Sequence, residues 1–194
     1  MRTFLLLLFM VLGGLHSSWG QRSDIEIYGT LPTIDDPVIS PSGSKIAYFQ
    51  NDGNGGDFLV VRDLATMEGQ GLELSGVKGQ YITFAGDNHV VLSASDTTRV
   101  RGFRGKFEMS AAYAFNLERG KGKFLLSKMK TLFPAQTGMG RIVGRSSDGD
   151  SVFTPAYVGE RSTDPRYSLI KADLDTGRGN VISRGRTTTI DWFV

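Results

Sequence analysis

The chain of 194 residues has 22 Lys and Arg against 20 Asp and Glu, a formal net charge of +2, and no cysteine. The near-neutral balance gives no electrostatic case for binding nucleic acid or an acidic partner. The lack of cysteine excludes disulfides, thiol nucleophiles and thiolate metal sites. With 40% hydrophobic and 10% aromatic residues, the chain can still form a core without those cross-links.

The first residues have the pattern of a secretory signal peptide. Arg2 precedes an unbroken apolar run at residues 4–12, and Ser18 and Gly20 are small residues at the −3 and −1 positions of a cleavage site. The run is shorter than the ~20 apolar residues that span a bilayer. We therefore predict a signal peptide over residues 1–20, cleaved after Gly20, and a periplasmic or secreted chain without a membrane span. An uncleaved N-terminal anchor is the alternative.

Short apolar runs separated by Gly-bearing turns follow, which is typical of an all-β fold. In the first run, residues 45–50, Ile46 and Tyr48 point to one face of a strand, and Ala47 and Phe49 to the other. A strand that is apolar on both faces belongs to a sheet covered on both sides. The same pattern recurs at residues 58–61 and 90–92.

These runs recur in a fixed order. A turn with Ser or Asp and Gly leads into an apolar strand, and a second strand then ends in Leu64, Leu117 or Leu174. A repeat of roughly 50 residues with four short strands per unit is typical of β-propeller blades. We predict an incomplete propeller over residues 21–194 with about three four-stranded blades. The expected blades span approximately residues 35–75, 76–130 and 138–187, and residues 188–194 begin a further blade.

Two turns are assigned within these blades. Residues 40–43 join the first and second strands of the first blade, where Gly43 accommodates a positive φ. Residues 175–177 form the hairpin between the third and fourth strands of the third blade. Such turns also occur in β-sandwiches, but three ordered copies favour a propeller.

Residues 39–48 read ISPSGSKIAY. This segment resembles the blade motif of prolyl oligopeptidase-family serine peptidases, the group of dipeptidyl aminopeptidases and acylaminoacyl peptidases. Further features at residues 98–105, 161–167 and 188–193 are similar to the N-terminal propeller of exported bacterial members. The resemblance covers about residues 24–194. It implies a propeller that restricts which peptides reach the serine of an α/β-hydrolase domain.

Members of this family have the catalytic serine in a G-x-S-x-G elbow, followed along the chain by Asp and His. That pattern does not occur here, and residues 144–149 have the wrong spacing. The chain is therefore expected to be truncated before the catalytic domain, to catalyse nothing by itself, and to have no catalytic, cofactor-binding or metal-binding residue. Two alternatives stay open: an autonomous periplasmic binding or scaffold protein, and a regulatory subunit completed by a separate hydrolase chain.

His89 is the only histidine after residue 20, so a Ser-His-Asp triad would have to use it. It lies in a turn at residues 86–89, without a serine or an oxyanion loop positioned beside it. We interpret it as a surface-turn histidine. A single histidine without cysteine also argues against a zinc site.

Residues 52–57, with Asp63 at the twelfth position, faintly resemble a calcium loop. Such a loop has Gly at its sixth position and Glu at its twelfth, and both positions are Asp here. We interpret residues 52–57 as a flexible hairpin tip. We interpret four further acidic residues as turn and hairpin-end residues rather than catalytic carboxylates: Asp148, Asp150, Asp173 and Asp175.

A basic segment at residues 99–106 has a pattern that can bind nucleic acid or phosphate. Its cations and the neighbouring aromatic residues are Arg99, Arg101, Arg104, Lys106, Phe103 and Phe107. The near-neutral charge and the predicted export argue against nucleic acid. We interpret the segment as a long loop on one propeller face. The family resemblance offers a second interpretation, a loop that approaches the catalytic domain and shapes access to it.

Three blades cannot close a ring that takes about four to eight. The two terminal blades would each present an apolar face, and Trp192 and Phe193 would have few partners. We therefore expect self-association, or contact with a missing catalytic domain, through these open faces. Peptide substrates are implied by the resemblance alone.

Overall fold

The computed structural model describes residues 32–53, 56–159 and 164–194, and residues Thr33–Val194 form one compact unit. The predicted signal peptide and its cleavage site after Gly20 lie outside the described residues. Part of the family-like segment, residues 161–163, also lies outside them. Over the described ranges, the chain has no helix of the length and apolar character needed to cross a membrane.

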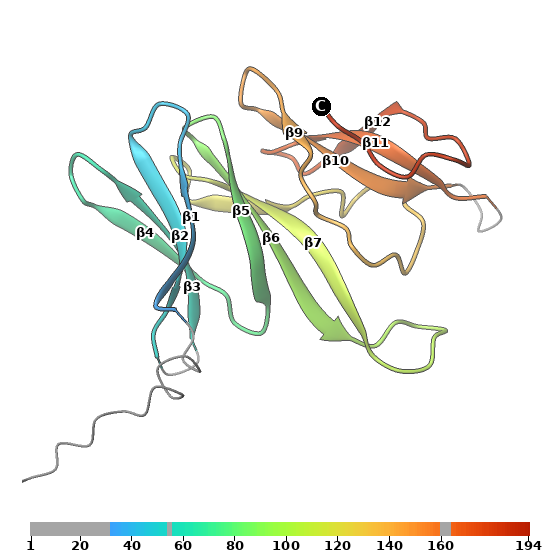
Figure 1. Ribbon diagram of the computed structural model, residues 1–194, viewed down its shortest axis with the longest axis horizontal. Helices are drawn as coiled ribbons and strands as arrows, with labels where there is room; N and C mark the ends of the chain where they lie inside the picture. Colours follow the sequence, from blue (N-terminus) through green and yellow to red (C-terminus); the bar gives the residue numbers. More distant parts are fainter. Residues whose placement is uncertain (1–31, 54–55, 160–163) are drawn as a thin grey trace, which may run out of the picture. The chain divides into compact units, whose positions relative to one another are not determined.

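The described strands form three antiparallel sheets of four strands, and the strands of each sheet are neighbours in chain order (Figure 1). The all-β prediction with three four-stranded, blade-like sheets is therefore confirmed. Sheet 1 contains β1 (Ile34–Ile39), β2 (Lys45–Asn51), β3 (Asp57–Asp63) and β4 (Gly69–Glu73). Sheet 2 contains β5 (Lys78–Ala85), β6 (His89–Thr98), β7 (Phe107–Asn116) and β8 (Lys121–Phe124). Sheet 3 contains β9 (Gly144–Arg145), β10 (Ser151–Val158), β11 (Arg166–Asp173) and β12 (Gly179–Ser183).

Both assigned turns lie where the sequence predicts them. The turn between β1 and β2 is closed by a hydrogen bond of 2.9 Å from Gly43 N to Ser40 O, and Gly43 has φ of 74°. The hairpin between β11 and β12 has the matching bond of 2.9 Å from Gly177 N to Asp173 O, with φ of 69° at Gly177. A positive φ is accessible to glycine because it has no Cβ to clash with the backbone.

Sheet 2 contributes to two apolar cores, one on each of its faces. Val90 and Leu92 pack with residues of sheet 1, whereas Val91, between them, packs with residues of sheet 3. On β5, Phe84 likewise packs with residues of sheet 1, and Ala85 packs with residues of sheet 3. Successive side chains of a strand point to opposite faces, so an unbroken apolar run is what a sheet packed on both sides requires.

The outer faces of sheets 1 and 3 differ. On sheet 1, Ile39 pairs with Ile46 on the face opposite the core, and Ile39 is 63% exposed. On sheet 3, residues 184–194 form no strand, although residues 188–194 are expected to begin a further blade. Instead, this segment returns to sheet 3, where Trp192 Nε1 donates a hydrogen bond of 3.0 Å to Tyr167 O. Phe193, beyond it, remains 86% exposed.

Candidate functional site

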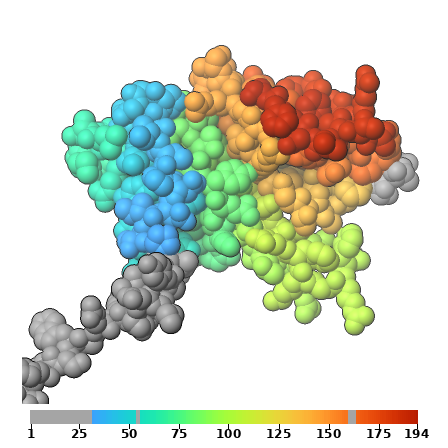
Figure 2. Space-filling view, in the orientation of Figure 1, coloured from blue at the N-terminus to red at the C-terminus, as the bar shows by residue number. Residues whose placement is uncertain are grey.

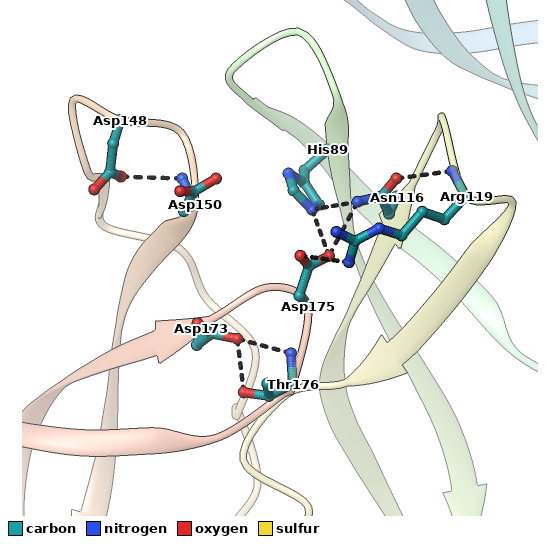
Figure 3. Close-up of polar contacts among 8 residues, drawn as sticks. All are labelled: His89, Asn116, Arg119, Asp148, Asp150, Asp173, Asp175 and Thr176. Atoms are coloured by element: carbon teal, nitrogen blue, oxygen red, sulfur yellow. Dashed lines mark hydrogen bonds and ion pairs between the residues drawn. The ribbon is translucent and has the colours of Figure 1, made fainter.

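Four polar side chains meet where the turns of sheet 2 lie against the β11–β12 hairpin of sheet 3 (Figure 3). His89 is the first residue of β6, Asn116 is the last residue of β7, and Arg119 follows in the turn to β8. Asp175 comes from the hairpin of sheet 3. We call these four residues the His89 cluster. The antiparallel pairing of His89 with Asn116 places both at the same end of sheet 2.

Asp175 is the centre of this cluster because its two carboxylate oxygens accept from all three other members. Oδ1 lies 3.1 Å from His89 Nε2 and 3.0 Å from Asn116 Nδ2. Oδ2 lies 2.7 Å from Arg119 Nη1 in an ion pair. His89 is 5% exposed and Asn116 is 6% exposed, so these two donors depend on Asp175 rather than on water.

The hydrogen bonds also assign the proton on His89. The backbone N–H of Arg119 donates to Asn116 Oδ1 over 2.9 Å, which turns the Nδ2 amide group toward Asp175 and His89. A carboxylate can only accept, so its bond to His89 requires a proton on Nε2. The 3.0 Å approach of Asn116 Nδ2 to His89 Nε2 is then a contact between two donors that share the same acceptor oxygen.

These contacts hold the pKa of Asp175 below its ordinary value. The hydrogen bond from His89 lowers the pKa most, the bond from Asn116 follows, and the Arg119 charge adds to both. Partial burial acts in the opposite direction. Asp175 is therefore a carboxylate at neutral pH, matched to the donors around it.

The cluster can join two sheets, but its geometry does not suit nucleophilic catalysis. In a Ser-His-Asp arrangement, the histidine nitrogen facing the serine must accept a proton, while the other nitrogen donates to the carboxylate. Here Nε2 donates to Asp175, and no serine hydroxyl within the described residues is hydrogen-bonded to His89. A cavity of about 190 Å³ is lined by all four residues of the cluster and by four further acidic residues, Asp87, Glu118, Asp148 and Asp150.

The interpretation of His89 as a surface-turn residue is wrong. The residue begins strand β6. It is buried because the β11–β12 hairpin, whose Asp175 lies 86 residues further along the chain, packs against it. Asp175 is a hairpin residue as predicted, but it also forms the ion pairs of the cluster. Nothing in the local sequence of either residue signals this contact; it depends on how sheets 2 and 3 pack.

The other acidic candidates stabilise turns, as predicted (Figure 3). Asp148 accepts a hydrogen bond from Ser146 Oγ and one of 3.0 Å from Asp150 N. Asp173 accepts bonds of 2.7 Å and 2.6 Å from the backbone N–H and the hydroxyl of Thr176. The carboxylates of Asp148 and Asp173 therefore hydrogen-bond to residues of their own turns.

Residues 52, 53 and 56 lie between β2 and β3, and Asp57 is the first residue of β3, so the hairpin lies where the sequence predicts it. Asn51 Nδ2 donates to Asp57 Oδ1 over 2.8 Å, and Gly56 N donates to Asp52 Oδ1 over 2.9 Å. Residues 54 and 55 lie outside the description. Within the described ranges, no group of three or more His, Cys, Asp or Glu residues is arranged to hold a metal ion.

The basic segment, residues 99–106, is the connection of the β6–β7 hairpin, and we call it the basic tip. In Figure 2 its yellow-green surface stands away from the sheets. Phe103 is 59% exposed and contacts Phe107 edge-on, with ring centroids 6.1 Å apart. The four cations of the tip form no ion pair with any described residue.

Comparisons with known proteins give structural similarities only. No protein-family profile and no curated protein matches the chain. The fold is similar to an acylaminoacyl peptidase in complex with Z-Gly-Gly-Phe-chloromethyl ketone, at 16% identity and a TM-score of 0.47 over 74% of this chain. It is similar to Pyrococcus horikoshii acylaminoacyl peptidase at 15% identity and a TM-score of 0.49 over 79% of this chain. It is similar to TolB from Acinetobacter baumannii at 19% identity and a TM-score of 0.45 over 82% of this chain.

The chain spans 24%, 26% and 33% of the lengths of these three structures. Acylaminoacyl peptidases belong to the group that residues 39–48 resemble. Because the identities are low, no catalytic or binding residue is transferred from these proteins to this chain.

Proposed function

We propose that this chain is a non-catalytic propeller segment that restricts peptide access to the serine of a prolyl oligopeptidase-family hydrolase domain. The observation that carries this proposal is the blade-like sheet formed three times in succession, with the family-like motif at residues 39–48 forming the β1–β2 turn and strand β2.

The outer face of sheet 1 supports contact with a further part of such an assembly. Ile34 and Ile39 are 54% and 63% exposed on strand β1, and Ile46, Phe58 and Val60 are only partly buried. An apolar sheet face gains free energy when a neighbour removes it from water. The partner in this proposal is the remainder of the propeller or its hydrolase domain.

An activity assay tests the absence of catalysis. The full chain is incubated with an aminoacyl chromogenic substrate, with and without a serine-directed inhibitor. We expect no turnover, because nucleophile, base and oxyanion loop do not come together around His89. Turnover that the inhibitor abolishes would overturn the proposal.

The gating role is tested with a hydrolase domain supplied separately. The nucleotide sequence beyond the codon for Val194 is read first, because a G-x-S-x-G reading frame there identifies the domain to add. We expect the hydrolase domain to cleave long and short peptides alike when alone, and to discriminate against long ones when the chain is present. Unchanged discrimination would contradict gating and favour an autonomous binding or scaffold protein.

Export to the periplasm or medium is part of the same proposal. It rests on the signal-peptide pattern of residues 1–20. Intact-mass measurement of the exported protein should show a chain that begins at Gln21. A mass that includes residues 1–20 would indicate an uncleaved anchor.

A further inference from the structure

The β6–β7 hairpin of sheet 2 is longer than the hairpin of sheet 1 that packs beside it. β6 and β7 each contain 10 residues, whereas β2 and β3 each contain 7. Leu92 belongs to the core that sheets 1 and 2 share, and Ala94 packs against the edge of that core. On β7, Tyr113, which pairs with Leu92, and Met109, which pairs with Asp96, line an open apolar groove of about 410 Å³.

The groove combines an apolar floor with an acidic rim. Leu72 and Leu74 form one side, and the Tyr113 and Phe124 rings meet edge-on across the other, with centroids 5.0 Å apart. Phe124 is 60% exposed, so the ring pair is open to a ligand. The charged residues that line the groove are both acidic, Glu73 and Asp96.

Glu73 accepts a hydrogen bond of 2.6 Å from Ser75 Oγ, and this neutral donor leaves its charge uncompensated. Asp96 is exposed on β6 and has no ion pair among the described residues. A ligand suited to this groove therefore combines an apolar or aromatic group with positive charge.

The basic tip has that combination. Arg101 and Arg104 are exposed on either side of Phe103, and among the described residues the Phe103 ring contacts only the ring of Phe107, in its own hairpin. The tip cannot fold back into the groove of the same chain, because the paired strands hold it beyond Asp96. Each strand residue advances the chain by about 3.3 Å, so Thr98, the last residue of β6, lies roughly 7 Å further along the hairpin than Asp96, and the tip begins beyond it.

We propose that the apolar groove is a self-association site, which receives the basic tip of a second copy of this chain. Two hairpins lie antiparallel about a two-fold axis, and each places Phe103 on the Tyr113–Phe124 pair of the other. Arg101 and Arg104 of each copy face Glu73 and Asp96 of its partner. The contact is isologous, since the same surface of both copies contributes tip and groove.

This interface is separate from the outer face of sheet 1 that the proposed function uses. A dimer through groove and tip can exist whether or not the chain controls a peptidase, and its test measures association rather than catalysis.

A charge exchange tests the proposal in the full chain. One variant reverses the groove (Glu73→Lys with Asp96→Lys) and another reverses the tip (Arg101→Glu with Arg104→Glu). Each variant alone opposes like charges in both halves of the dimer, so we expect dimerisation to weaken by at least roughly tenfold. The mixture opposes unlike charges in both halves, so we expect a heterodimer of wild-type affinity. Sedimentation equilibrium of each variant and of the mixture measures this.

The matched control reverses two exposed acids outside the groove, Glu68→Lys with Glu118→Lys, which changes the net charge as much as the groove variant does. It should dimerise like the wild type. Phe103→Ser, at an exposed position, should weaken the dimer without changing the unfolding midpoint measured at protein concentrations at which the wild type is dissociated. A monomeric wild-type chain would overturn the proposal. Association that neither charge reversal weakens would also overturn it, because the dimer contact would then lie on another face. A groove that binds a small apolar cation but not the basic tip would overturn it as well.

Discussion

The junction between sheets 1 and 2 and the junction between sheets 2 and 3 both bury an apolar cluster, but they are closed by different polar contacts. At the first junction, each cross-sheet hydrogen bond joins a side chain to a backbone group. These bonds are Ser42 N to Asp87 Oδ1 at 3.0 Å, Ile82 N to Asp36 Oδ2 at 2.7 Å, and Gln70 Nε2 to Leu117 O at 3.1 Å. The second junction also has a bond of this kind, from Arg145 Nη1 to Phe84 O at 3.1 Å, but there the His89 cluster in addition joins four side chains around one carboxylate.

The two junctions therefore differ in how much the loss of a single side chain should destabilise them. A backbone N–H or C=O is present whatever the side chain, so one substitution at the first junction removes one partner of one bond. At the second junction, Asp175 is the shared acceptor for three donors, two of them buried. Loss of that single carboxylate leaves buried donors without an acceptor, which costs more than the bond itself contributes. We therefore expect the second junction to be the more sensitive to charge and pH.

The largest losses of unfolding free energy should come from substitutions in the apolar clusters, which both junctions have. Phe84 belongs to the first cluster at 2% exposure, and Ile170 belongs to the second at 0%. Phe84→Ala should cost about 3–5 kcal/mol and Ile170→Ala about 2–5 kcal/mol of unfolding free energy, because each leaves a cavity. Urea unfolding at neutral pH measures both. A loss below about 1 kcal/mol at either site would mean that its cluster is not well packed.

The close approach of two glycine turns at the second junction should give the next largest effect. Gly149 has φ of +74°, and a Cβ built on it would lie 2.9 Å from Gly86 Cα. Gly120 has a similar φ of +58° but open space around it. Gly120→Ala should cost about 1–2 kcal/mol through the left-handed backbone alone. Gly149→Ala should cost more, because it also separates sheets 2 and 3. Equal losses in thermal unfolding would show that the turns move apart freely.

The fold was predictable from the sequence because its signals are local. The apolar run at residues 90–92 shows by itself that sheet 2 is covered on both faces, and the two cores confirm this. The turns at Gly43 and Gly177 are equally local, since a positive φ is a property of one residue and its neighbours.

The His89 cluster and the apolar groove were not predictable, since neither is a local property. His89 meets a residue 86 positions away, and their contact depends on the packing of two sheets. The groove depends on β6 continuing as a strand through residues 93–98, a polar stretch that ends in Asp96-Thr97-Thr98. Ser, Asp and Ala do not favour a strand by themselves, and the whole stretch is paired with β7.

Substitution of the central carboxylate should have a moderate effect. Asp175→Asn keeps the shape of the side chain but removes its charge, which weakens the bonds from His89, Asn116 and Arg119. We expect a loss of about 1 kcal/mol, reduced from the value for a buried pair because the Asp175 side chain is 38% exposed and Arg119 is 63% exposed. Asp87→Asn at the first junction is the matched control and should cost less. A larger loss from Asp87→Asn would reverse the comparison between the junctions.

The smallest expected effect is the pH dependence of that same carboxylate. The cluster lowers the pKa of Asp175 in the folded chain, so the ionised form favours folding. Its contribution is fully present above the unfolded value of about 3.9 and is lost as pH falls through the lower folded value. The difference in unfolding free energy between wild type and Asp175→Asn should therefore shrink as the pH falls below about 4. Other aspartates with lowered pKa values, such as Asp87 and Asp148, are present in both proteins and cancel in the difference. A difference that stays unchanged down to pH 3 would mean that ionisation of Asp175 does not contribute to the difference between the two proteins.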